Sequence, residues 1–190
     1  MKLPKLILAS ASPRRKELLA QLHLEFQIIP SEIDEIHNEH LTAGELCQVN
    51  AYRKARAISK KFPDALVIGV DTLVTLGSRI FGKPKTRVEA RRMLEALQSR
   101  THQVLSGVCL AHLRSHRQKV FAAQTHVTFR PLTASQIDQY HQQVDPMDKA
   151  GAYGIQESGD DIVERISGSF SNVVGLPLEQ LQIELLDFRL

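Results

Sequence analysis

The sequence predicts a single domain, residues 1–190, with a mixed α/β fold. Apolar runs typical of buried strands alternate with amphipathic helical patterns through the first half of the chain. Two long strand-like segments then follow one another across a polar turn at residues 114–117. The chain is 43% hydrophobic and 24% charged, a globular composition that allows a substantial core. These observations together predict a mixed, partly antiparallel sheet with helices around it.

The first half of the chain begins with an apolar run, residues 6–9, that predicts a buried strand. Ser12 suits the N-cap of the helix that follows, and Pro13 suits its first position because proline has no N–H to leave unpaired. A second helix starts at a capping box, Thr42 to Glu45, and its pattern ends at Pro63. The other expected elements are strands at 26–30 and 66–70 and a hairpin of 72–76 with 79–81 around Gly77 and Ser78.

The second half begins with a helix behind another capping box, Thr86 to Glu89. Later segments show strand periodicity, a further helix start at Thr133, and a stop signal before the last helix. The expected elements are strands at 103–113 and 120–130, a helix from 133 to about 144, a Gly-rich loop or short strand at 148–156, a strand at 162–166 and a helix at 178–186.

Composition excludes several classes of function. The net charge is +3, and the basic residues form short clusters rather than a long tract. Tryptophan is absent and aromatic residues make up 5%, so platforms for stacking single-stranded nucleic acid are scarce. Cys47 and Cys109 lack the spacing of a metal knuckle or redox pair, and reduced thiols are expected. No apolar run approaches the length of a membrane span or fits a signal peptide, so we expect a cytoplasmic protein with no membrane or nucleic-acid partner.

The junction between the first strand and the first helix carries anion-binding chemistry. The free backbone N–H groups at the start of this helix are accompanied by two hydroxyl and two guanidinium groups, those of Ser10, Ser12, Arg14 and Arg15. Helix N-termini attract phosphate, and arginine adds forked, permanently charged donors. The alternative is an ordinary capped helix with exposed arginines. With no histidine base near in sequence, the serines are expected to hold phosphate oxygens rather than act as nucleophiles.

Asp71 is the single residue that most specifically indicates a functional site, because it ends the apolar strand 66–70, where an unpaired carboxylate is costly. Glu35, in an acidic loop, can join Asp71 in holding Mg²⁺ or Mn²⁺, which prefer carboxylate oxygen and keep several waters. The alternatives are a turn cap at Asp71 and a solvated acidic loop. Zinc at His37 and His40 is disfavoured because no third ligand follows at a suitable spacing.

Further residues with suitable chemistry are spread along the chain. Lys54 and Lys83, together with the arginines of the first helix, could neutralise a triphosphate, although each alone reads as a solvated surface charge. Lys149 and Gln156 flank small residues that let backbone approach a ligand, and a side-chain amide can pair with one edge of a base. Structural turn glycines are the alternative there. The hydroxyl-rich segment 167–177 could line the same cleft or be a plain connection.

Taken in order, these segments resemble the Maf family of nucleotide pyrophosphatases, also called septum formation inhibitor proteins. The matching pieces cover nearly the whole chain: Ser10-Ala-Ser-Pro-Arg-Arg15, Glu35, Ala51-Tyr-Arg-Lys-Ala55, Gly69-Val-Asp-Thr72, Gly82-Lys-Pro84, Thr101-His-Gln-Val104, residues 148–156 and Val174-Gly-Leu-Pro177. The resemblance implies an elongated, ITPase-like α/β fold with two lobes around a central cleft, and commonly a homodimer. It also implies hydrolysis of a nucleoside triphosphate to the monophosphate and pyrophosphate with a divalent cation.

Within the family, Thr72 and the run from Lys149 to Gln156 resemble the branch that acts on dTTP and UTP. The resemblance makes Asp71 the proton acceptor and gives Arg14, Thr72 and Gln156 the choice of substrate. Glu157 departs from the family pattern, in which glycine is common at this place. Two alternatives stay open: a nucleotide- or nucleic-acid-binding regulator of septum formation without turnover, and a 7-methyl-GTP pyrophosphatase.

Overall fold

The computed structural model describes residues 4–188; residues 1–3 and 189–190, the ends of the predicted 1–190 domain, lie outside this range. Within this described range, seven strands form one sheet in the order β2-β1-β3-β5-β6-β7, with β4 pairing with β3. Strand β1 (Leu6–Leu8) pairs in parallel with β2 (Phe26–Ile28) and β3 (Leu66–Leu76). The pairs β3–β4 and β6–β7 are antiparallel, so the predicted mixed α/β fold is confirmed.

The chain divides into two compact units. The first comprises Met1–Thr72, Ser106–Ala123 and Gly175–Leu190, and the second comprises Leu73–Leu105 and Gln124–Val174. The boundaries fall within β3, β5 (Thr101–His112) and β6 (Arg117–Phe129), so each of these strands contributes to both units. The single domain and the central cleft stay predictions.

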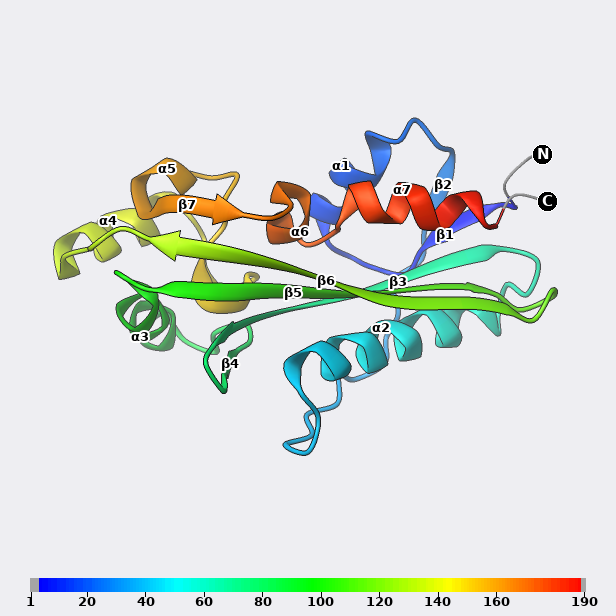
Figure 1. The fold of residues 1–190 in the computed structure, drawn as a ribbon, viewed down its shortest axis with the longest axis horizontal. Helices are drawn as coiled ribbons and strands as arrows, with labels where there is room; N and C mark the ends of the chain where they lie inside the picture. The colour runs from blue at the N-terminus through cyan, green and yellow to red at the C-terminus, as the bar shows by residue number, and fades with distance from the viewer. Residues whose placement is uncertain (1–3, 189–190) are drawn as a thin grey trace. The chain divides into compact units, whose positions relative to one another are not determined.

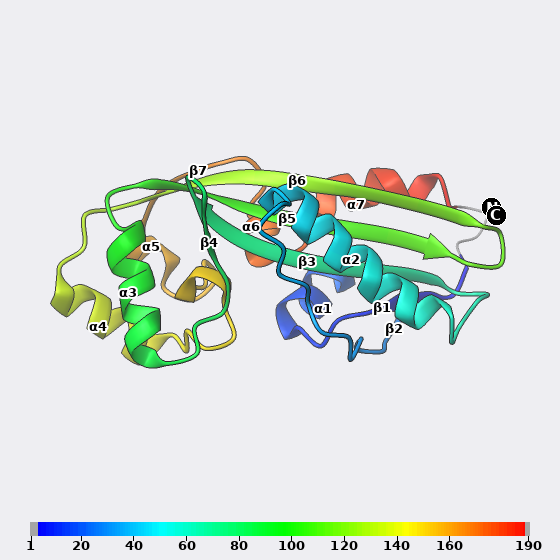
Figure 2. The ribbon, with the colours of Figure 1, turned by 90° about the horizontal axis from the view of Figure 1, so that it is seen from below.

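In the first unit, the sheet has helices on both sides. Helix α2 (Ala43–Ser59) lies on one side, and α1 (Pro13–Ala20) and α7 (Leu178–Leu186) lie on the other (Figure 1). The view from below shows α2 running along the strands (Figure 2). The apolar core between α2 and the sheet contains Ile7 of β1, Val67 of β3, Cys109 of β5 and, from α2, Ala51, Ala55 and Ile58. Small residues on α2 therefore allow the helix to lie close to the strands.

The second unit has its own apolar core, built from both strands and helices. Phe129 packs edge-on against Tyr153 and His102, with ring centroids 4.8 and 4.6 Å away. The elements of this unit are β4 (Arg79–Phe81), α3 (Arg87–Leu97), α4 (Ala134–Gln143), the 3₁₀ turn η1 (Ala150–Ala152), α5 (Gly159–Ile162), β7 (Val163–Ser167) and α6 (Phe170–Val174). Two of them, α5 and α6, were missed by the sequence reading because helices of four and five residues are too short to show a period.

Two expected details are wrong. Asp71 does not end a strand: β3 runs without interruption from Leu66 to Leu76, because backbone pairing with β4 continues the strand beyond the acidic side chain. At α3, Thr86 caps the Glu89 N–H, but the Glu89 carboxylate accepts from Lys85 N at 2.7 Å instead of returning to Thr86. The capping box at Thr42 is confirmed.

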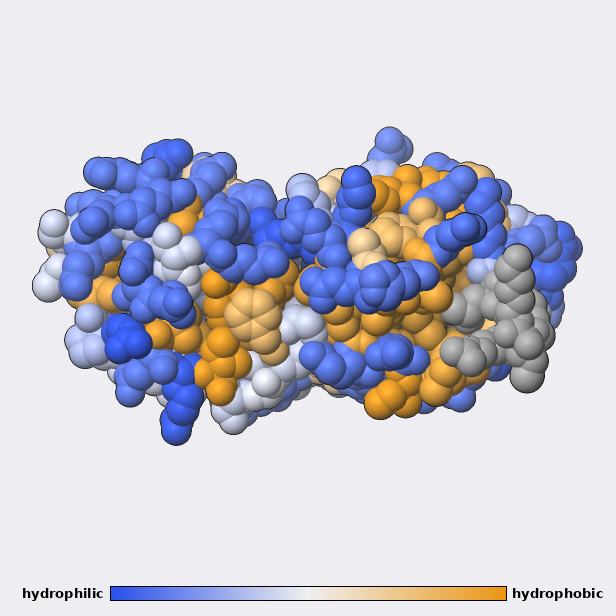
Figure 3. Space-filling view, turned by 90° about the horizontal axis from the view of Figure 1, so that it is seen from above, coloured by the Kyte–Doolittle hydropathy of each residue, from blue (hydrophilic) through white to orange (hydrophobic). Residues whose placement is uncertain are grey.

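The surface combines hydrophilic and apolar side chains. Figure 3 shows one face of the molecule, on which apolar patches lie between hydrophilic side chains. Helix α7 leaves Ile183 and Leu186 exposed while burying Leu181 and Leu185, so apolar residues occur outside its buried stripe as well. Within residues 4–188, no helix has the length and apolar character needed to cross a membrane.

Candidate active site

The start of α1 is built from the two predicted serines. Ser12 is the N-cap, with extended backbone angles, and its hydroxyl accepts from Arg15 N at 3.5 Å. The Ser10 hydroxyl accepts from Ser12 N at 3.3 Å, and Pro13 occupies the first turn as expected. This local network fixes the junction between β1 and α1, from which Arg14 and Arg15 project.

Arg15 directs its guanidinium into the first unit. Its Nε donates to Gly175 O at 2.9 Å, and its Nη1 donates to Ser10 Oγ and Val70 O, each at 3.2 Å. Its Nη2 donates to Thr72 Oγ1 at 3.0 Å. Burial lowers the pKa of Arg15, although the charges of Asp71 and Glu35 oppose that shift. Arg15 thus connects α1, β3 and the segment before α7, and most of its donors already have protein acceptors.

The hydroxyl group of Thr72 is held in place by Arg15 and by two further neighbours. Besides accepting from Arg15, Thr72 Oγ1 lies 2.9 Å from Ser106 Oγ and 3.4 Å from Gly175 O. Ser106 is fully buried in β5, and the sequence reading did not single it out. Its signal was a lone hydroxyl inside the apolar run of that strand.

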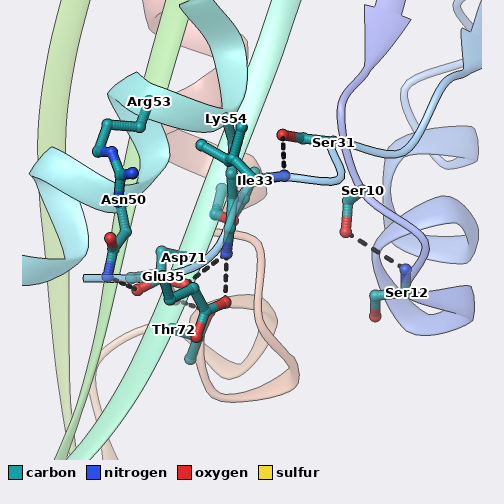
Figure 4. Close-up of polar contacts among 12 residues, drawn as sticks. Ser10, Ser12, Ser31, Ile33, Glu35, Asn50, Arg53, Lys54, Asp71 and Thr72 are labelled. Atoms are coloured by element: carbon teal, nitrogen blue, oxygen red, sulfur yellow. Dashed lines mark hydrogen bonds and ion pairs between the residues drawn. The ribbon is translucent and has the colours of Figure 1, made fainter. Parts of the chain in front are cut away.

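Asp71 lies at the centre of the candidate site and is almost fully buried, with 3% of its surface exposed. The Lys54 ammonium is 2.6 Å from Asp71 Oδ1 and also 2.6 Å from Glu35 Oε1 (Figure 4). Burial raises the pKa of Asp71, and the nearby charge of Glu35 raises it further. The positive charges of Lys54 and Arg15 lower this pKa, but burial outweighs them and the pKa lies above its ordinary value. Two carboxylates from distant parts of the sequence therefore converge on one cation.

One turn of α2 holds the acidic loop that carries Glu35. Arg53 Nη1 donates to Asp34 O at 2.8 Å, and Lys54 binds the Glu35 carboxylate. The buried amide of Asn50 bonds both backbone groups of Ile36. The sequence analysis predicted Lys54 but missed Asn50. Asn50 could have been found as a polar residue four positions before Lys54, a spacing that puts both on the same face of the helix.

The structure places the remaining predicted residues as follows. Arg14 is half-buried on the first turn of α1, in the first unit. Lys83 and Gln156 are exposed in the second unit. Lys149 is buried there, and its ammonium donates to Asp145 O at 2.8 Å. The same ammonium pairs with Asp148 and Glu157 at 2.9 and 3.4 Å, so the unusual Glu157 has a partner inside its own loop.

The segment 167–177 uses its polar groups inside the protein. Asn172 is buried in α6, and its Nδ2 donates to Val104 O at 3.1 Å and to Thr125 Oγ1 at 3.0 Å. Ser169 N donates to the same threonine hydroxyl at 3.1 Å. This amide and the Ser169 N–H secure α6 against the strands of the second unit. At the other end of the segment, Gly175 O accepts from Arg15 Nε of the candidate site.

Comparison with known proteins adds to this geometry. A model of the family described as "Maf-like protein" matches residues 5–188. The chain belongs to the Maf family. The resemblance noted in its sequence is thereby confirmed over almost the full length.

Two curated relatives are similar along nearly their whole lengths, and both are named dTTP/UTP pyrophosphatase. The one from Moorella thermoacetica is 50% identical over 178 residues, which cover 94% of this chain and 92% of the relative. The one from Acetivibrio thermocellus is 47% identical over 191 residues, covering 97% and 95%. A solved structure of a HAM1 protein from Coxiella burnetii has a TM-score of 0.54 at 17% identity, covering 97% of this chain and 100% of that one. This likeness concerns the fold alone.

Proposed function

We propose that this chain hydrolyses dTTP and UTP to the nucleoside monophosphate and pyrophosphate. The observation that carries the proposal is the buried Asp71, held together with Glu35 by Lys54 in the same unit as the arginine-bearing start of α1. The names of relatives 50% and 47% identical over nearly the whole chain support the same substrates. A single buried carboxylate with a cation beside it suits activation of water, and the arginines suit phosphate charge.

Asp71 serves as the proton acceptor in this proposal. A water molecule attacks the α-phosphorus, and its proton passes to Asp71. The bond from the α-phosphorus to the bridging oxygen breaks, and pyrophosphate leaves with that oxygen. Burial favours this role, because a raised pKa makes a carboxylate a stronger base while Lys54 still supports its ionised form.

The proposal includes a divalent cation, Mg²⁺ or Mn²⁺, held by Glu35 and Asp71. Within residues 4–188, no group of three or more His, Cys, Asp or Glu side chains is placed to hold a metal ion. The pair nevertheless fits, since two carboxylate oxygens lie 2.6 Å from one ammonium and Mg²⁺ commonly takes one or two carboxylates plus substrate phosphates and water. When bound, the ion would supply positive charge that offsets the negative charge of the phosphates.

The remaining roles rest on residue chemistry and, for the choice of substrate, on the resemblance, and they are part of the proposal. Ser10, Ser12, Arg14 and Arg15 would hold phosphate or position the groups that do. Lys54 and Lys83 would offset phosphate charge, and Lys149 would supply a substrate-binding cation beside Gln156. Arg14, Thr72 and Gln156 would govern the choice of substrate. Because Arg15 and Thr72 contact one another, their contribution would be to shape the site from within. A homodimer and a cytoplasmic location complete the proposal.

The test is pyrophosphate release from a panel of dTTP, UTP, CTP, purine triphosphates and 7-methyl-GTP, with Mg²⁺ or Mn²⁺. The proposal expects stoichiometric monophosphate and pyrophosphate, with dTTP and UTP turned over fastest. Asp71→Asn should abolish release, whereas Asp138→Asn, the same substitution at a half-exposed carboxylate on α4, should not. Tight binding of nucleotide or nucleic acid without turnover, or a preference for 7-methyl-GTP, would overturn it.

A further inference from the structure

The side chain of Asn50 contacts the Asp71 carboxylate and the loop of Glu35, but it belongs to none of the groups assigned to the reaction. It is buried in α2, with 2% of its surface exposed. Its Oδ1 accepts from Ile36 N at 2.9 Å, and its Nδ2 donates to Ile36 O at 3.3 Å. The same Nδ2 lies 3.4 Å from Asp71 Oδ2. One amide group therefore contacts the loop of Glu35 and the side chain of Asp71 together.

The contacts with Ile36 fix which way the amide faces. A backbone N–H can only donate and a backbone carbonyl can only accept, so Oδ1 must face Ile36 N and Nδ2 must face Ile36 O. This orientation directs the Nδ2 donors to the side on which Asp71 Oδ2 lies. An aspartate of the same size would present an oxygen acceptor to two other acceptors.

The pair of bonds to Ile36 determines where Glu35 sits. Glu35 precedes Ile36 in a loop outside any helix or strand, and its side chain is 45% exposed. The loop is held to α2 by Arg53 at Asp34 O, by Lys54 at the Glu35 carboxylate and by Asn50 at Ile36. Of these three, Asn50 is the buried one with a short side chain, and it binds backbone in both directions. It is thus the least adjustable of the contacts that hold the loop.

Lys54 and Asn50 contact different oxygens of the Asp71 carboxylate. Lys54 lies against Oδ1, and Asn50 lies against Oδ2. Because the two residues are four positions apart on one helix, they face Asp71 from the same side. The orientation of the Asp71 carboxylate and the position of Glu35 therefore both depend on this face of α2.

We propose that Asn50 is a positioning residue that sets the spacing of the Glu35 and Asp71 carboxylates. The inference rests on the proposed function for its catalytic consequence, but the spacing also determines how well the pair binds a divalent cation. Loss of a partner that orients a metal ligand commonly costs about 10- to 100-fold in metal affinity or activity. The losses caused by substituting Asn50 should fall in that range.

The experiment compares Asn50→Leu and Asn50→Asp with the matched control Gln48→Leu, which makes the same amide-to-leucine change on the same helix. Binding of Mn²⁺ to the nucleotide-free protein is measured by electron paramagnetic resonance. Exchange of the Ile36 amide is followed by NMR, and kcat and KM are measured with dTTP. Thermal unfolding identifies any variant that does not fold.

Asn50→Leu should bind Mn²⁺ about 10- to 100-fold more weakly, with a similar fall in kcat. Asn50→Asp adds a carboxylate that itself attracts the cation, so for this variant the expected loss is in kcat. KM for dTTP should stay within about threefold, because the hydrogen bonds of the Asn50 amide go to Ile36 and Asp71 rather than to the groups proposed to hold phosphate. The Ile36 amide should exchange at least about tenfold faster. Gln48→Leu should leave all four quantities unchanged. Asn50→Asp keeps the size of the side chain and decides the question if Asn50→Leu does not fold.

Wild-type Mn²⁺ affinity and kcat in a folded Asn50 variant would overturn the inference, since a merely structural residue would change only the unfolding temperature. Failure of the proposed function looks different. In that case the wild-type protein releases no pyrophosphate from any triphosphate, while the effect of Asn50 on Mn²⁺ binding and Ile36 exchange is still decided.

Discussion

Helix α2 lies against β3 at Gly69 without space for a side chain. A Cβ atom at this position would be 2.2 Å from Ala51 O, 2.6 Å from Ala55 N and 2.9 Å from Ala55 Cβ. Two of these atoms belong to the helix backbone, so no rotamer change can relieve the contact. Gly69→Ala therefore forces α2 to move away from the strand by about 1 Å to restore ordinary van der Waals separation.

The displacement should reach the candidate site, because Asn50 and Lys54 adjoin the two alanines that would be pushed. Lys54 can follow Asp71 by a change of rotamer, but the short Asn50 side chain cannot. Overpacking of this kind costs about 1–3 kcal/mol, which lowers Tm by about 2–12 °C for a chain of this size. A misplacement of about 1 Å in an active site can lower kcat by about 100-fold.

Thermal unfolding by circular dichroism and steady-state pyrophosphate release measure the two effects. Gly82→Ala is the matched control for stability, because a Cβ there would have no neighbour within 4 Å. Its Tm should equal that of the wild type. If Gly69→Ala also keeps the wild-type Tm and kcat, the close approach of α2 does not hold the site, and the reasoning is refuted.

Three further outcomes are expected. Burial raises the pKa of Asp71 above its ordinary value of about 4, so ionising it costs folding free energy as pH rises through and above that value. Asp71→Asn should therefore lose turnover yet exceed the wild-type Tm by more at pH 8 than at pH 4.5; an equal difference at both pH values would contradict this. Arg15→Lys keeps the charge but cannot reach Gly175 O, Val70 O and Thr72 Oγ1 together, so kcat/KM for dTTP should fall about tenfold; an unchanged kcat/KM would show that these contacts do not matter. Burial raises the pKa of Cys47 and Cys109 to about 12, so a thiol reagent should label them only after unfolding, and rapid labelling of the native protein would count against their burial.

Local chemistry in the sequence was enough to predict most of the fold. The Thr42–Glu45 capping box and the last helix at Leu178–Leu186 appear in the structure as predicted, because caps and helical periodicity depend on residues a few positions apart. Short elements such as α5 and α6 leave no such period. The sequence predicts that Asp71 ends a strand, because a carboxylate is costly in an apolar run. The structure offsets that cost with Lys54, which comes from another element.

The candidate site was predictable in its residue types and less so in its contacts. The sequence indicated Asp71, Glu35 and Lys54 as reactive groups, and the structure brings their charged atoms together. It did not indicate that Arg15 would donate to Thr72, 57 positions away, or that Asn50 would bind the loop after Glu35. These contacts depend on how β3, α1 and α2 pack, and packing between distant segments leaves no spacing in the sequence.

Hydrolysis of dTTP in ¹⁸O-labelled water tests the central claim most directly, because it shows which phosphorus atom the water attacks. If Asp71 activates water for attack at the α-phosphorus, the label appears in dTMP and the pyrophosphate carries none. Mass spectrometry of both products measures this distribution. Label in the pyrophosphate, or release of inorganic phosphate in place of pyrophosphate, would contradict the account.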